Sequence, residues 1–267
     1  MAREKHRLRN WAWLALVIAS ALAPFPPQPL EAAEGRVADI LEQQETLQFT
    51  VKFLIFPEVG TVRITFGRQG AFYLATIRTE PKGPLPALLG NPSFFYQTRM
   101  EEVAGGKRLR VLQSVQVQER RGTVRKVVNT LDYQTRSRER RFTKTGQPPK
   151  VSRFSIPEGV YLDDFLTTFY NLRLQAYGPV RPGARFEIDI MSKRGQAKIY
   201  IEIKEQEPDS LVVLVSTNQK LLGSKRGQIR MVLGPDLVPK EVTVVSVFGL
   251  GDAVGQLVSR EVEPFNR

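Results

Sequence analysis

The sequence predicts a mainly β protein: a large curved antiparallel sheet, barrel-like or half-barrel, with one amphipathic helix at about residues 162–173. Three observations lead to this fold class. After residue 46, apolar and polar residues alternate with a period of two, which is typical of strands with one buried face. Turns bearing Gly and Pro separate these runs, as in a series of hairpins. The period becomes helical only once, and the chain is long enough for one such domain.

The first half indicates a meander of neighbouring strands. Its first strand alternates over Leu47, Phe49, Val51, Phe53 and Ile55. A turn is expected at residues 57–60, and residues 80–95 are expected to be mostly loop because they carry six Pro and Gly residues. The other expected strands are 61–66, 71–78, 95–103, 108–118 (with one slip in the alternation), 123–133 and 135–142, and residues 146–149 close this half.

The helix is predicted from one apolar stripe, and further strands follow it. Leu162, Phe165, Leu166, Phe169 and Tyr170 fall at helical spacing, and residues 177–179 end the helix. The strands expected after it are 186–190, 199–203, 211–215, 228–233, 238–248 and 253–262. This gives a single antiparallel β domain over residues 46–263; two domains with a boundary near residues 145–160 are the less favoured alternative.

The N-terminus has the layout of a secretory signal peptide. Four basic residues precede an uncharged run from Trp11 to Ala23, prolines at 24–27 break it, and small residues follow at 32–33. The run is shorter than the roughly 20 apolar residues that span a bilayer, so cleavage near Ala33 is favoured over an uncleaved anchor. We therefore expect residues 1–33 to be a signal peptide, 34–45 a lead-in, and the mature chain to lie in the periplasm or cell envelope without a transmembrane span.

The composition excludes several classes of chemistry. The chain has no Cys, and its one histidine, His6, lies in the predicted signal. Zinc sites built from Cys or His, Ser-His-Asp triads and Cys-His nucleophiles are therefore ruled out for the mature chain. Asp163 and Asp164 could be read as catalytic or metal-binding carboxylates, but acidic residues in a first helical turn are expected for electrostatic reasons alone. We expect no enzyme activity, no catalytic residues, no metal and no cofactor.

Several motifs occur in an order that resembles a known bacterial family. They are Glu45-x-Leu47-x-Phe49-x-Val51 followed by Gly60, the strand end Asn129–Tyr133, Tyr170–Arg173 in the helix, Pro182–Phe186, and Pro239–Val242. Over roughly residues 40–262 the chain resembles the envelope family catalogued as domain of unknown function 3108 (DUF3108), apart from the proline-rich segment 80–92. The resemblance implies an exported β-rich protein of a Gram-negative bacterium and supplies no catalytic residues.

The charge pattern indicates contact with anionic surfaces. Removal of residues 1–33 takes away four of the 39 basic and two of the 27 acidic residues, which leaves a net charge of +10. Export makes nucleic acid an improbable partner, whereas lipid and lipopolysaccharide phosphates are the anions of an envelope. The candidate contact residues are Arg138, Arg140, Arg141, Lys193, Arg194, Lys225 and Arg226. The alternative is a solvated rim that prevents edge-to-edge strand pairing.

Aromatic residues near the helix supply candidate ligand contacts. These are Phe94, Phe95, Phe165, Phe169, Tyr170 and Tyr177, which could line a lipid-sized pocket between helix and sheet or pack as ordinary core. The favoured hypothesis is a non-catalytic envelope protein that binds or carries an apolar, lipid-like ligand. The alternative is a structural or interaction module that docks on an envelope protein partner.

Overall fold

A computed structural model describes residues 38–84, 87, 90–103, 105, 107–207, 210–217, 227–247 and 251–265, within one unit extending from Ala32 to Arg267. The predicted signal peptide, Lys225 and Arg226 lie outside the described residues. A 3₁₀ helix (Ala38–Glu42) precedes the first strand. The α-helix is α3 (Phe165–Arg173), and the strands are β1 (Gln43–Phe53), β2 (Phe56–Gln69), β3 (Phe72–Pro81), β4 (Ser93–Val103), β5 (Arg108–Arg120), β6 (Thr123–Asp132), β7 (Ser137–Lys144), β8 (Gln147–Ser155), β9 (Arg185–Ser192), β10 (Gly195–Glu207), β11 (Ser210–Ser216), β12 (Gln228–Leu233), β13 (Pro239–Val247) and β14 (Gly251–Pro264).

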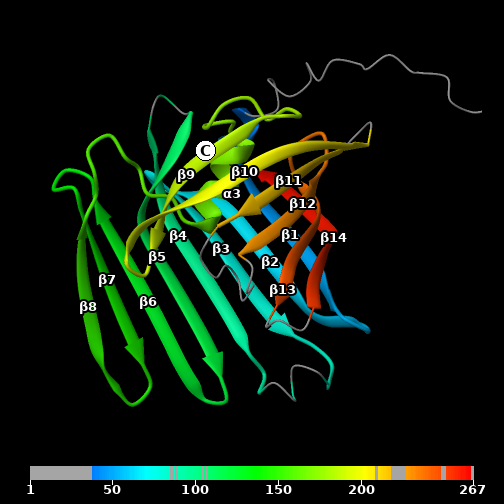
Figure 1. Ribbon diagram of the computed structural model, residues 1–267, viewed down its shortest axis with the longest axis horizontal. Coiled ribbons are helices and arrows are strands. Elements are labelled where there is room, and N and C mark those ends of the chain that lie inside the picture. Colours follow the sequence, from blue (N-terminus) through cyan, green and yellow to red (C-terminus); the bar gives the residue numbers. More distant parts are fainter. Residues whose placement is uncertain are drawn as a thin grey trace, which may run out of the picture. The chain divides into compact units, whose positions relative to one another are not determined.

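The strands form one antiparallel sheet of 14, which confirms the predicted fold class (Figure 1). The order is β8 to β1, then β14 to β9, so two meanders are joined where β1 pairs with β14. The first and last strands of the domain are therefore neighbours at the middle of the sheet. Strands β8 and β9 are its two edges, and the chain crosses from one edge to the other through residues 156–184, which include α3.

Helix α3 lies against the concave side of the curved sheet and is almost fully buried. It begins where the side chain of Asp164 accepts a hydrogen bond from the Thr167 N–H, as in a standard N-cap. It ends at Arg173 with Leu174 as its C-cap, and the next residue, Gln175, has a φ of 54°. Phe165 packs against apolar residues from both meanders, so the helix supplies core to each half of the sheet.

Buried polar residues of α3 are paired with the first meander. The Asn171 side chain bonds to both the N–H and the carbonyl of Leu109, at 2.8 Å each, which satisfies backbone groups of β5. The Arg173 guanidinium forms a two-pronged ion pair with Glu45 of β1, at 2.5 and 3.0 Å. Glu45 also binds Arg260 of β14 at 2.9 Å. These contacts fix the helix to β5 and to β1, which lies at the middle of the sheet.

The two sheet edges approach each other without a shared hydrogen-bond ladder among the described strands. The Arg138 side chain on β7 donates to the carbonyls of Ser192 and Gly195 at the β9–β10 turn, at 2.7 and 2.9 Å. The crossing segment pairs with β9, because the N–H of Asp163 donates to Asp189 and its carbonyl accepts from Met191. A small core of Val111, Leu131, Ile156 and Leu162 fills this junction.

Local details differ from the prediction in three places. Ile55, expected on a buried face, is 89% exposed, because the first turn falls at residues 54–55, where Leu54 has a φ of 53°. Residues 57–60, expected to turn, belong to β2. Residues 146–149, expected to close the first half, lead into a further strand, β8 (Gln147–Ser155). Its prolines are tolerated because an edge strand leaves one row of N–H positions unpaired.

Candidate binding site on the inner face of β4–β8

We call the side of β4–β8 that faces α3 their inner face. Alternation along each strand identifies it, since Met100, Val111, Leu131 and Arg138 point to this side and are buried. The strand register then places inner residues of neighbouring strands opposite one another, in rows that cross the sheet. Burial decreases from row to row away from α3, and the lower parts of β5–β8 have no other element drawn over them in Figure 1.

The row next to the buried residues Met100, Val111, Leu131 and Arg138 is polar. We call it the polar row; it consists of Thr98, Ser114, Asn129, Arg140 and Ser152. At its inner end, the Thr98 hydroxyl donates to Asp164 at the N-terminus of α3, at 2.5 Å. The Asn129 amide donates to the Ser114 hydroxyl at 3.0 Å. Thr98 and Ser114 are buried, Asn129 and Arg140 are half-buried, and Ser152 is exposed, so the row leads from the helix to the surface.

The next row outward is largely apolar and open. We call it the apolar row; it consists of Tyr96, Gln116, Val127, Phe142 and Lys150. Val127 and Phe142 are only half-buried and belong to none of the core clusters of the described residues. Phe94, one step further along β4, stacks on Tyr96 with ring centroids 6.2 Å apart. Phe94 and Tyr96 also pack against the core, whereas Val127 and Phe142 form apolar surface that an apolar ligand can cover.

Two arginines on this face have no carboxylate partner among the described residues. Burial lowers the pKa of Arg138 to about 10, with the charge of Arg140 as a further cause. Burial also lowers the pKa of Arg140. The Arg138 guanidinium lies 4.5 Å from the ring centroid of Phe154, and its Nε is buried without a hydrogen-bond partner. Desolvated positive charge without a counter-ion gives this part of the inner face a positive potential.

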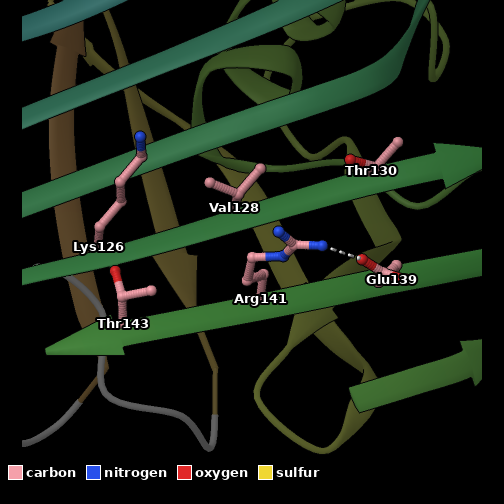
Figure 2. Close-up of a pocket in the computed structure, with 6 residues that line it drawn as sticks. All are labelled: Lys126, Val128, Thr130, Glu139, Arg141 and Thr143. Atoms are coloured by element: carbon pink, nitrogen blue, oxygen red, sulfur yellow. Dashed lines mark hydrogen bonds and ion pairs between the residues drawn. The ribbon is translucent and has the colours of Figure 1, made fainter. Parts of the chain in front are cut away.

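The nearby acid points to the outer face instead. Glu139 of β7 binds Arg141 at 3.4 Å and Arg153 at 3.3 Å. Figure 2 shows Glu139 and Arg141 together at a surface hollow of about 300 Å³. That hollow is lined from β6 and β7 by Lys126, Val128, Thr130, Glu139, Arg141 and Thr143. Two of its three charged side chains, Glu139 and Arg141, are paired with each other.

The structure separates the predicted ligand residues. Phe169 and Tyr170 are packed core, and Tyr170 stacks on Phe66 with a centroid distance of 4.1 Å. Phe165 and Phe94 are half-buried against the same core. Phe95 lies on the outer face, where the guanidinium of Arg78 is 5.7 Å from its ring centroid. Tyr177 bonds to Asp163. The six residues therefore lie in different places, and Phe94 is the member that lies beside the apolar row.

The predicted anion-contact residues are separated as well. The prediction that Arg138 contacts an anionic surface is wrong, because its side chain is fully buried and bonds to the β9–β10 turn. Arg140 lies on the inner face and Arg141 on the outer face, as alternation along β7 requires. Lys193 and Arg194 are exposed at the β9–β10 turn. Sequence reasoning missed the polar row, because its members come from five strands and only the register brings them together.

A second polar cluster surrounds the Asp163 side chain. Its Oδ2 accepts hydrogen bonds from the Tyr177 hydroxyl at 2.5 Å and from Arg108 at 3.2 Å, while Oδ1 is buried without a partner. Arg108 in turn lies 5.2 and 5.4 Å from the ring centroids of Tyr161 and Tyr177. Burial raises the pKa of Asp163 to about 7, the Asp164 charge adds to this, and Arg108 opposes it.

The raised pKa of Asp163 predicts that the stability of the protein depends on pH. Because its folded-state pKa of about 7 exceeds the ordinary 3.8, its contribution is complete below about pH 4 and is lost as the pH rises through 7. We expect Asp163→Asn to remove this loss. The free energy of unfolding of the variant, relative to wild type, should increase by up to about 4 kcal/mol between pH 4 and pH 8.

Urea denaturation across this pH range measures the difference. Asp132→Asn is the control, because hydrogen bonds from Thr135 and Gln134 lower the pKa of Asp132, so any pH-dependent difference falls below pH 4. A difference between Asp163→Asn and wild type that stays constant from pH 4 to pH 8 would contradict the assignment.

The fold and this face define a mainly β protein whose single curved sheet surrounds a helix and leaves part of its inner surface open. No protein-family model matches the chain, and no curated protein matches it. Among solved structures, it is similar to a β-barrel-like protein of domain of unknown function DUF1849 from Brucella abortus. The two are 11% identical with a TM-score of 0.47, over 84% of this chain and 98% of the other. Among the described residues, no helix is long and apolar enough to cross a membrane.

Proposed function

We propose that this chain is an exported, non-catalytic protein of a bacterial cell envelope, related to the DUF3108 family, that binds a lipid-like ligand on the inner face of β4–β8. One observation carries the proposal: Val127 and Phe142 of the apolar row are only half-buried on a face that elsewhere holds core. Burying such a surface against a ligand is favourable by about 25 cal/mol per Å² of apolar area. The signal-like N-terminus supports export.

The experiment is purification of the full chain from the periplasm of a Gram-negative host, followed by native and denaturing mass spectrometry. We expect a polypeptide that begins at Glu34 and carries a stoichiometric organic mass, which is lost on denaturation. Phe142→Ser should retain at most a small fraction of that mass, because a polar group replaces the half-buried aromatic side chain of the apolar row.

Val128→Ser is the matched control, since Val128 is the outward-facing neighbour of Val127 on β6. It should retain the ligand. A bare polypeptide mass that is unchanged after incubation with envelope lipids would overturn the binding function. It would favour the alternative, a module that docks on an envelope protein.

A further inference from the structure

We propose that the ligand is an anionic amphiphile, with its acidic head group on the polar row beside Arg140 and its apolar tail along the apolar row. This inference rests on the proposed function and names the class of ligand. It is carried by the position of Arg140 between two different surfaces. Across the sheet Arg140 pairs with Asn129 and Ser152, and two residues along β7 it is followed by Phe142.

Arg140 has the free hydrogen-bonding capacity that a head group needs. Its guanidinium lies 5.8 Å from the Phe142 ring centroid, and it forms no ion pair with a described residue. A guanidinium has five N–H donors and no acceptor, and its fork matches a carboxylate or phosphate. Asn129 and Ser152 stand on either side with further polar groups. The position therefore combines a half-buried cation with neutral donors.

The neighbouring charges favour an anion over a neutral or cationic head. Arg138 lies two residues before Arg140 on the same face of β7. It is fully buried, and its Nε has no hydrogen-bond partner. Further out, Arg125, Lys144 and Lys150 lie on the same side of β6–β8. Glu139, the acid of β7, is turned to the outer face and paired there. A bound acid would supply a counter-ion on the inward positions of β6–β8, where the described residues include no carboxylate. Asp164, an acid on this side, lies at the other end of the polar row and is bonded to Thr98.

The geometry also sets the direction of the ligand. The polar row lies nearer to α3, and the apolar row with Phe94 and Tyr96 lies towards the open end of β4–β7. The head group would thus lie at Arg140 and the tail would cross Phe142 and Val127. The open end is bordered by Arg125 and Lys144, which can meet the aqueous phase.

The test is a pair of titrations with hexadecanoate and hexadecanol, which share a chain and differ in the head group, both at monomeric concentrations. The delipidated mature chain should bind the acid at least about tenfold more tightly than the alcohol. In Arg140→Gln this preference should fall to about twofold or less. Arg141→Gln, which removes the adjacent charge on the outer face, should keep the full preference, and Arg140→Lys should keep most of it.

The outcomes separate this inference from the function on which it rests. Equal affinity for acid and alcohol would overturn the head-group assignment but leave an apolar binding face. Equal losses in Arg140→Gln and Arg141→Gln would assign the preference to overall charge and also overturn it. Binding of neither compound would overturn both proposals. Hexadecyl phosphate in place of the acid distinguishes a phosphate from a carboxylate head.

Discussion

Replacing Arg173 by methionine is expected to lower the free energy of unfolding by about 3–5 kcal/mol. Arg173 is 1% exposed, and its two contacts with Glu45 join α3 to β1 at the middle of the sheet. Burial lowers the pKa of Arg173, but the hydrogen bonds and charge of Glu45, together with Tyr170 and Asp236, outweigh this and hold the pKa above its ordinary value. Removing Arg173 leaves the buried Glu45 carboxylate with Arg260, which is 33% exposed, as its remaining partner, and a buried charge that loses its buried partner is the costly case for an ion pair.

The double variant Glu45→Leu with Arg173→Met is the control for that interpretation. Exchange of both partners for apolar residues of similar size should recover most of the loss, since no charge then remains buried. Arg260 keeps its contact with Asp236 in the double variant. Guanidinium denaturation of the four members of the cycle measures the coupling. Additive losses in the double variant would contradict a coupled pair.

Replacing Tyr170 by alanine is expected to cost about 3–5 kcal/mol, as for other large aromatic residues in a packed core. Tyr170 is 0% exposed, stacks on Phe66 and contacts Phe169 edge to face. Tyr170→Phe should be as stable as the wild type or more stable by about 1 kcal/mol, because the hydroxyl is buried without a partner.

The same two variants show whether the Tyr170 side chain is part of the packed core or contacts the ligand. If Tyr170 lined an open cavity, truncation to alanine would change ligand retention with little loss of stability. Because Tyr170 lies in the packed core, Tyr170→Ala is expected to lower stability and Tyr170→Phe to retain the periplasmic ligand. Thermal unfolding together with native mass spectrometry of both variants provides the two readouts.

The strands and the helix were readable from periodicity. Leu47 and Phe49 are buried as the two-residue period predicts, and the slip expected in residues 108–118 is a register shift between β4 and β5. The α-helix begins at Phe165, three residues after the predicted start, because Asp164 caps it. Strand β8 was missed, since its residues are nearly all exposed and alternation cannot mark a strand without a buried face.

The candidate site could not be predicted, because it depends on register and on which face is inward. Alternation separates Arg140 from Arg141, but it does not say which of them shares a side with the core. The burial of Arg138 is set by the β9–β10 turn, more than 50 residues later in the chain. The expectation that a rim of basic residues contacts anions therefore changes to one half-buried cation on the inner face.

The position of the ligand is the central claim, and photo-crosslinking tests it most directly. A fatty acid with a diazirine near the middle of its chain is bound to the mature protein, and the complex is irradiated. The modified residues are then mapped by peptide mass spectrometry. We predict labels on the inward residues of β4–β7, chiefly Tyr96, Val127 and Phe142. Labels confined to the outer hollow at Val128 and Thr143, or to residues 82–92, would contradict a binding site on the inner face.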